Sequence, residues 1–144
     1  MKNLPLTEYY PVFIERTARQ FKNFSQQQFS RKGIRITSEQ WSVLKKINEK
    51  EGINQKEIAE FTSKDPASVT RMLDTLENKR YVIRKITQND RRTCALFLTD
   101  RGKKIVEKAM PVSEKVLTRG LEGVTEEELK EAQKILDKIF NNLI

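Results

Sequence analysis

Residues 88–102 read QNDRRTCALFLTDRG, a polar and charged stretch that passes directly into an apolar run at 94–98. Upstream, YVIRKI at 81–86 is rich in β-branched and aromatic residues. Two such runs separated by polar residues predict a β-hairpin. The charged residues of the stretch would then lie at the hairpin tip, where they can bury nothing.

The segment before this hairpin, KDPASVTRMLDTLENK at 64–79, predicts a helix with one apolar and one polar face. Asp65 can cap it, and Pro66 fits the first helical position, where its missing N–H costs nothing. The core face comprises Val69, Met72, Leu73 and Leu76, at helical spacing. The opposite face comprises Ala67, Arg71, Asp74, Thr75 and Asn78, flanked by Ser68 and Thr70. Small and hydroxylic residues with one arginine suit a helix that enters a DNA groove, because they allow close approach and polar contacts.

Further helices are predicted on both sides of this unit. Their expected ranges are 9–29, 37–52 and 54–62, followed by a helix from Thr99 and a last helix from Thr125. Gly33 and Gly52 are placed to end helices. Pro11 fits the start of a helix and poorly its interior, and Pro111 predicts a kink or break in the helix from Thr99.

This order of elements predicts a mainly α fold with a small β-hairpin wing, that is, a winged helix-turn-helix with N- and C-terminal helices around it. We expect an N-terminal dimerisation helix at 1–36, a DNA-binding domain at 37–100 and C-terminal dimerisation helices at 101–144. Within the DNA-binding domain the recognition helix is expected at about 65–79 and the wing at about 81–99.

The composition favours a homodimer. The chain has 144 residues, of which 37% are hydrophobic and 33% charged, so the core of one isolated copy would be thin. The terminal helices carry broad apolar stripes that a second copy could cover. The alternative is that these helices pack on their own domain.

The distribution of charge indicates a polyanionic partner. The net charge is +8, and the segment 64–104 holds eleven basic and five acidic residues, a net of +6. Concentrated basic charge in a small protein is typical of nucleic-acid binding. A solvated lysine-rich face is the alternative that the charge alone leaves open.

The single cysteine cannot form an internal disulfide, which favours a reducing compartment. The start of the chain has no signal-peptide pattern, and no stretch approaches the ~20 apolar residues of a membrane span. A cytoplasmic protein is expected. Cys94 follows the hairpin tip on a strand with Leu96 and Leu98, which indicates a half-buried structural thiol rather than an oxidant sensor.

At this point the sequence resembles the multiple-antibiotic-resistance regulator (MarR) family of transcription factors. The wing pattern of Asp-x-Arg, a strand and Leu-Thr-x-x-Gly is present as Asp90, Arg92, Leu98, Thr99 and Gly102. SVTRMLDTLENKRYVIR is similar to the family's recognition helix and first wing strand, although Lys79-Arg80 stands where the family often has glycine. The resemblance implies a homodimeric transcription regulator, usually a repressor, on a pseudo-palindromic operator. It also implies a possible phenolic or anionic small-molecule effector between the dimerisation and DNA-binding parts.

The expected DNA-binding residues follow from the two motifs. On the recognition helix they are Ser68, Thr70 and Arg71, with Ala67 and Thr75 on the same outward face. On the wing, the resemblance implies that Arg92 enters the minor groove and Asp90 orients it, while Arg91 meets phosphate. The alternatives are a solvated helix surface for Arg71 and an exposed ion pair of ~0–1 kcal/mol for Arg92 with Asp90.

Other functional classes fit the sequence poorly. The chain has no histidine, no glycine-rich phosphate loop and no nucleophile with an evident base, so we expect neither catalytic residues, a metal site nor a cofactor. A winged helix that binds protein instead of DNA would need an apolar outward face on the helix after Pro66. A non-specific DNA-binding protein without an effector is a further alternative.

Overall fold

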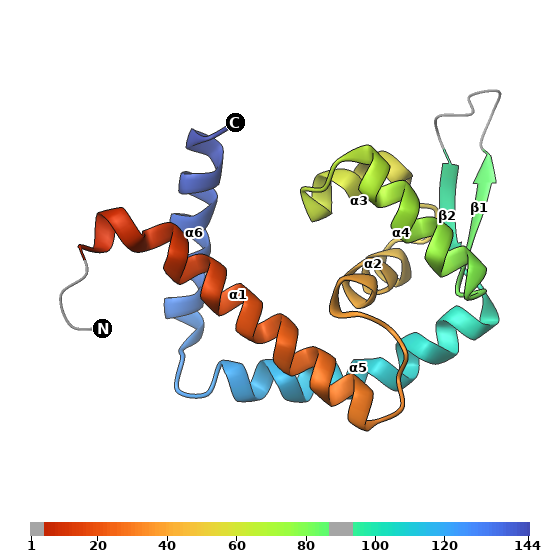
Figure 1. The fold of residues 1–144 in the computed structure, drawn as a ribbon, viewed down its shortest axis with the longest axis horizontal. Coiled ribbons are helices and arrows are strands. Elements are labelled where there is room, and N and C mark those ends of the chain that lie inside the picture. The colour runs from red at the N-terminus through yellow and green to blue at the C-terminus, as the bar shows by residue number, and fades with distance from the viewer. Residues whose placement is uncertain (1–4, 87–93) are drawn as a thin grey trace.

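A computed structural model describes residues 5–86 and 94–144 of the chain. Its elements follow the predicted order, with a hairpin between two sets of helices (Figure 1). They are α1 (Leu6–Arg31), α2 (Ser38–Glu49), α3 (Gln55–Thr62), α4 (Pro66–Asn78), β1 (Val82–Ile86), β2 (Cys94–Leu98), α5 (Asp100–Gly120) and α6 (Glu126–Asn142). The winged helix-turn-helix fold expected from the sequence is confirmed.

Five helices begin where the sequence places a capping residue. The side chains of Thr37, Asn54, Asp65, Thr99 and Thr125 each accept a hydrogen bond from the backbone N–H three residues ahead. In α2, α3 and α6 the third residue of the helix also accepts a bond from the cap's own backbone N–H. These caps satisfy N–H groups that have no partner inside the helix.

Both prolines within helical patterns lie differently from the prediction. Pro11 lies inside α1, and α5 runs through Pro111 as one helix, so the expected break is absent from that described element. Each proline removes one intrahelical hydrogen bond. Both are exposed, so water can reach the carbonyl group that loses its partner.

The wing is an antiparallel pair of strands that is tied to the helix-turn-helix. Val82 pairs with Leu98 at its base, and Ile86 pairs with Cys94 at the last described position. The turn before α3 pairs briefly with the other edge of β2, because the N–H of Gly52 donates to the carbonyl of Leu96 at 2.8 Å. Cys94 itself is half-buried. The base of the wing is therefore fixed from both sides of β2.

The junction between α4, the wing and α5 explains the Leu-Thr-x-x-Gly motif. The Thr99 hydroxyl donates to the carbonyl of Arg80 and accepts from the N–H of Gly102. A Cβ atom on Gly102 would lie 2.0 Å from the carbonyl oxygen of Tyr81, so only glycine permits this approach. Arg80 has a φ of 62°, the left-handed conformation that glycine adopts without strain.

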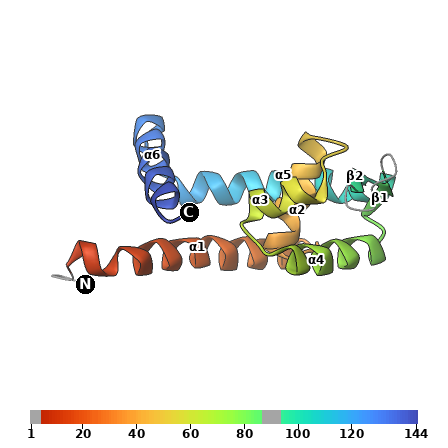
Figure 2. The same ribbon diagram turned by 90° about the horizontal axis from the view of Figure 1, so that it is seen from above.

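The hydrophobic core lies within the winged unit and extends to the end of α1. Trp41 of α2 packs edge-on against Phe29 of α1, with ring centroids 6.0 Å apart, and its indole N–H donates to Ser113 of α5 at 3.0 Å. Leu44 and Leu73 are fully buried in the same cluster. Seen from above, α1 and α4 lie along one edge of the molecule with α5 behind them (Figure 2).

The other end of the molecule is much less buried. In the part of the chain that the structure describes, no residue of α6 is buried, although the helix has a continuous apolar stripe. α6 and the start of α1 lie away from the wing strands (Figure 1). None of the helices within residues 5–86 and 94–144 is long and apolar enough to cross a membrane.

Candidate nucleic-acid interface

The recognition helix α4 is anchored by one face and presents the other. Val69, Leu73 and Leu76 are buried against the core. Ala67 and Arg71 are exposed, as predicted for the outward face. Thr75 is exposed beside them. The helix therefore has the orientation that contact with a groove requires.

Arg71 is held by a chain of polar groups at the start of α4. Its guanidinium donates to the Ser68 hydroxyl at 3.1 Å, and that hydroxyl donates to the Asp65 carboxylate. Hydrogen bonds from the Ser68 side chain and backbone, with the charge of Arg71 as a smaller cause, lower the pKa of Asp65 below its ordinary value. The carboxylate therefore stays ionised at neutral pH and orients Ser68 and Arg71 before any ligand arrives.

Two threonine hydroxyl groups of α4 donate their hydrogen within the helix. The Thr70 hydroxyl donates to the carbonyl of Pro66 at 2.9 Å, and the Thr75 hydroxyl donates to the carbonyl of Arg71 at 3.0 Å. Each hydroxyl has one hydrogen to donate, and phosphate oxygens only accept. In this arrangement both threonines offer DNA an acceptor and a methyl group, which suits base edges better than phosphates.

Gln55 is a candidate contact that the sequence analysis missed. It is the first residue of α3, and its amide donates to the Thr70 hydroxyl at 2.7 Å. The second amide hydrogen and the carbonyl oxygen are not used in this bond, and an amide can pair bidentately with adenine. The sequence shows that Gln55 lies in the first turn of α3, directly after the Asn54 cap. Its contact with α4 could not be predicted, because that contact depends on the angle between the two helices.

Arg84 links the wing to the recognition helix. It lies on β1, is 19% exposed, and pairs with Asp74 of α4. Its Nε lies 2.9 Å from a carboxylate oxygen of Glu77, within ion-pair range, but the angle does not make a hydrogen bond. Arg84 thereby fixes the first wing strand against α4 and neutralises two carboxylates of that helix.

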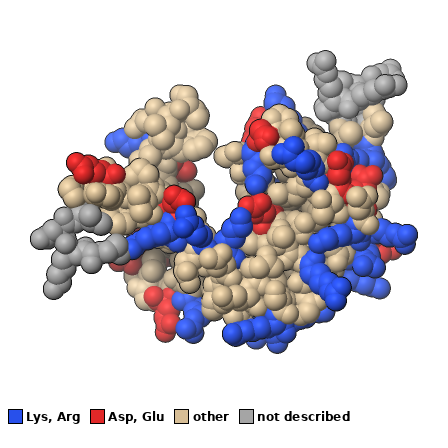
Figure 3. All heavy atoms as spheres, in the orientation of Figure 1, with Lys and Arg blue, Asp and Glu red and all other residues tan. Residues whose placement is uncertain are grey.

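Several cations counted in the basic segment are already paired with groups of the same chain. Lys64 pairs with Glu39 at 2.9 Å, and Lys103 pairs with Glu51 at 3.8 Å. Lys79 donates to the carbonyl of Arg35 at 2.8 Å. The cations of this segment without a carboxylate partner among the described residues are Arg71, Lys79, Arg80, Lys85, Arg101 and Lys104. In Figure 3 basic side chains spread over the winged part, whereas the tip of α6 is largely uncharged.

The predicted tip of the wing lies outside the described residues. This applies to Asp90, Arg91 and Arg92. The two strands that lead to the tip end at Ile86 and Cys94, which are paired with each other. The roles expected for the three tip residues stay predictions.

Comparisons with known proteins agree on one family. A model of the MarR family matches residues 36–94. The chain is 34% identical over 104 residues to the HTH-type transcriptional repressor MdtR of Bacillus subtilis, covering 72% of this chain and 67% of that protein. It is 28% identical over 106 residues to the transcriptional regulator HosA of Escherichia coli, covering 74% of this chain and 78% of that protein.

A solved structure gives the same result for the whole fold. The chain superposes on a mutant of MarR from Escherichia coli complexed with operator DNA, with a TM-score of 0.79 and 25% identity. The match covers 95% of this chain and 99% of that one, so it includes the terminal helices as well as the winged unit.

Proposed function

This chain belongs to the MarR family of DNA-binding transcriptional regulators, and from this premise we propose that it forms a homodimer that represses transcription from a pseudo-palindromic operator. The family comprises regulators and not enzymes. The observation that carries the proposal is α4, which buries Val69, Leu73 and Leu76 while it exposes Arg71 on the opposite face.

The exposed apolar stripe of the terminal helices supports the homodimer. On α6, Ile135 is 41% exposed, Leu136 43% and Phe140 51%. On α1, Ile14 is 37% exposed and lines one hollow together with Ile135 and Leu136. Contiguous apolar surface of this kind marks an interaction site in a folded protein. We propose that a second copy covers it, with residues 1–36 and 101–144 forming the dimerisation region and 37–100 the DNA-binding domain.

The dimer would place two copies of α4 in successive major grooves, ~34 Å apart. The proposed contacts on α4 are Ala67, Ser68, Thr70, Arg71 and Thr75, and those on the wing are Asp90, Arg91 and Arg92. Arg71 is pre-oriented for guanine or phosphate, and Arg92 would read the width of the minor groove.

Repression would follow from occupancy of a promoter by the dimer, and the relative MdtR is named as a transcriptional repressor. Release of the dimer from DNA would require a ligand. That ligand would bind more tightly when the two winged units have a spacing that does not fit the operator. A phenolic or anionic molecule bound between α1, α2 and α5 is the form of regulation that the family resemblance implies.

The first test is replacement of Arg71 by alanine and by lysine, with binding measured on duplexes of varied sequence. Loss of a bidentate contact to guanine costs ~1–3 kcal/mol and relaxes the preference at that base. Arg71→Lys should retain phosphate attraction but lose the base preference, while Lys134→Ala on α6 serves as the control. Affinity loss that is equal for all sequences would make Arg71 a phosphate contact. Unchanged binding by both variants would remove α4 from the interface and favour the protein-binding alternative.

A further inference from the structure

The charges of α5 are sorted by side. At about 3.6 residues per turn, five of its cations fall within about 60° of one another around the helix. These cations, here called the α5 stripe, are Arg101, Lys104, Lys108, Lys115 and Arg119. The acidic residues of the helix follow a different strip and are Asp100, Glu107 and Glu114. The stripe is ~27 Å long, because each helical residue adds ~1.5 Å.

The α5 stripe is exposed and has no internal counter-charge among the described residues. Each of its residues is exposed, and none forms an ion pair with a carboxylate in the ranges 5–86 and 94–144. Two of them lie over aromatic rings, Arg101 over Tyr81 at 5.5 Å and Arg119 over Phe24 at 5.7 Å. A ring contact leaves the positive charge in place. Like charges along one side repel one another, so a bound polyanion would relieve this repulsion.

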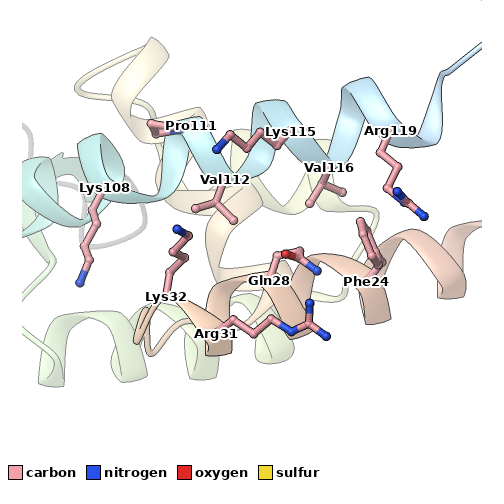
Figure 4. Close-up of a pocket in the computed structure, with 10 residues that line it drawn as sticks. All are labelled: Phe24, Gln28, Arg31, Lys32, Lys108, Pro111, Val112, Lys115, Val116 and Arg119. Carbon is pink, nitrogen blue, oxygen red and sulfur yellow. The ribbon is translucent and has the colours of Figure 1, made fainter.

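Neighbouring elements widen the basic surface. Beside the start of the stripe, the exposed Arg80 follows α4, and its carbonyl accepts from the hydroxyl of Thr99, the cap of α5. Farther along, Arg31 and Lys32 at the end of α1 lie across a hollow from the stripe, and Figure 4 shows Lys108 pointing to the side on which α1 lies. In Figure 3 basic side chains follow the lower edge of the molecule, along which α5 runs in Figure 1.

The length and the chemistry of the stripe fit duplex DNA better than a small anion or a protein. A small anion reaches only the nearest cations of a row ~27 Å long, whereas a duplex carries one negative charge per ~1.7 Å of its axis. A protein interface has a core that is depleted in charged residues. Leu117, the exposed large hydrophobic residue of α5, lies on the opposite side of the helix from Lys115 and Arg119. Charge complementarity therefore favours a phosphate backbone.

The stripe lies outside the surface proposed to read the operator. α4 ends at Asn78, seven residues or ~10 Å beyond Arg71 along the helix axis. α5 begins past this end, directly after the wing strand β2. Duplex DNA that continues past a half-site would have to bend around the base of the wing to reach the stripe. Added phosphate contacts can offset the cost of such a bend.

We propose that the α5 stripe binds the phosphate backbone of the same duplex beyond the outer end of each half-site, without regard to base sequence. The contact adds cations that α4 does not supply, so it contributes affinity that depends on duplex length and on salt. The inference rests on the proposed function for the position of the half-sites.

The test compares two duplexes that carry the inverted repeat obtained by selection. One ends at the outer edges of the half-sites, and the other has one further helical turn, about 10 base pairs, on each side. At low salt the wild type should bind the longer duplex at least about tenfold more tightly, and added salt should remove the difference. If three cations of each subunit neutralise one phosphate each, the plot of log affinity against log salt should be steeper by ~5 for the longer duplex.

The stripe variant carries Arg101→Gln, Lys104→Gln and Lys108→Gln. It should lose the preference for the longer duplex and keep wild-type affinity for the short one. Hydroxyl-radical cleavage gives an independent readout, because the wild type should protect the flanking backbone and the stripe variant should not.

A matched control loses the same amount of positive charge elsewhere. It carries Lys103→Gln, on another side of α5 where Lys103 pairs with Glu51, together with Lys134→Gln and Lys138→Gln on α6. This control should retain the preference for the longer duplex and the protection of the flank. The comparison separates the position of the cations from the net charge of the protein.

Four results would overturn the proposal. Equal affinity of the wild type for the two duplexes at low salt would leave an acidic protein as the partner of the stripe. Retention of the preference by the stripe variant would show that other cations hold the flank. Equal loss of affinity for both duplexes would place these cations in the half-site contact instead. If one dimer binds two short duplexes and the stripe variant binds one, the stripe holds a separate duplex.

Failure of the proposed function has a different result. The wild type would then show no preference for an inverted repeat. If it still bound the longer duplex more tightly through the stripe, the stripe would be a DNA contact of a protein that does not recognise an operator.

Discussion

Leu73 of α4 and Leu136 of α6 both lie in the apolar stripe of an amphipathic helix, yet Leu73 is fully buried and Leu136 is 43% exposed. The difference holds for the two regions as a whole. The winged unit completes its core within one chain, with Leu44, Leu73 and Leu96 all at 0% exposure. α6 has the apolar stripe of a packed helix, but no surface among the described residues covers that stripe. One region completes its core within the chain, and the other leaves its apolar stripe exposed among the described residues.

The largest expected effect is on association of two copies. Leu136→Asp would place a carboxylate in the proposed dimer contact, and a two-fold interface would contain it twice. Burial of an unpaired charge costs several kcal/mol, so the dimer should dissociate at micromolar concentration. Sedimentation velocity measures this directly.

The matched control for that substitution is Lys134→Asp, which changes charge on the same helix at an exposed polar position. It should leave the dimer intact. If Leu136→Asp remains dimeric, α6 does not form the interface, and the exposed stripe needs another partner.

The second effect is on folding of the winged unit. Leu73→Ala should lower the free energy of unfolding by ~2–5 kcal/mol, because it removes buried methyl groups and leaves a cavity. Chemical denaturation at several protein concentrations checks this. Leu136→Ala should instead lower stability by an amount that depends on protein concentration. Equal behaviour of the two alanine variants would contradict the contrast between the regions.

Local signals in the sequence predicted the five capped helix starts, whereas α1, which has no side-chain cap, begins at Leu6 and not at the expected residue 9. Contacts between residues far apart in the sequence were not predictable from such signals. Thr37 and Asn54 cap their helices through neighbours three residues away, so the pattern alone contains the contact. Arg84 pairs with Asp74 ten residues earlier across a change from helix to strand, and nothing in the spacing of charges indicates it. Of the kink or break predicted at Pro111, the break is absent, because packing of α5 against α1 and α2 outweighs one lost hydrogen bond.

The same limit applies to the candidate interface. The outward face of α4 was predictable from helical periodicity, and Arg71 lies there. The use of the Thr70 hydroxyl by Pro66 and Gln55 depends on how α3 crosses α4. The sequence therefore predicted which face of α4 is exposed, while the structure is needed to say which hydrogen-bonding groups on that face are available.

A smaller effect is expected at the junction after α4. Arg80→Gly should stabilise the protein by about 1 kcal/mol, because glycine adopts the left-handed conformation of residue 80 without strain. Arg80→Ala removes the same charge but keeps the strained conformation. Thermal denaturation of the two variants therefore separates the effect of the charge from the effect of the strain. A glycine variant no more stable than the alanine variant would show that the conformation is unstrained.

The smallest effect concerns the bridge between α1 and the winged unit. Glu39 of α2 pairs with Lys22 of α1 and with Lys64, and hydrogen bonds from these two lysines lower its pKa below the ordinary 4.5. The stabilisation is present above pH 4.5 and is lost as the pH falls through the lowered pKa of the folded state. Since the side chain is 38% exposed, we expect less than ~1 kcal/mol.

Glu39→Gln checks the bridge. Its stability relative to the wild type should be lower at neutral pH, and the difference should shrink in acid. A difference that stays constant between neutral and acid pH would show that the ion pairs do not contribute.

The most direct measurement is selection of bound duplexes from a randomised pool at physiological salt, followed by sequencing of the survivors. A dimer with two copies of α4 in successive grooves predicts an enriched inverted repeat with half-sites about one helical turn, 10–10.5 base pairs, apart. Survivors without a shared motif, bound only at low salt, would contradict sequence-specific recognition by this chain. A single enriched half-site without its inverted copy would contradict the dimer.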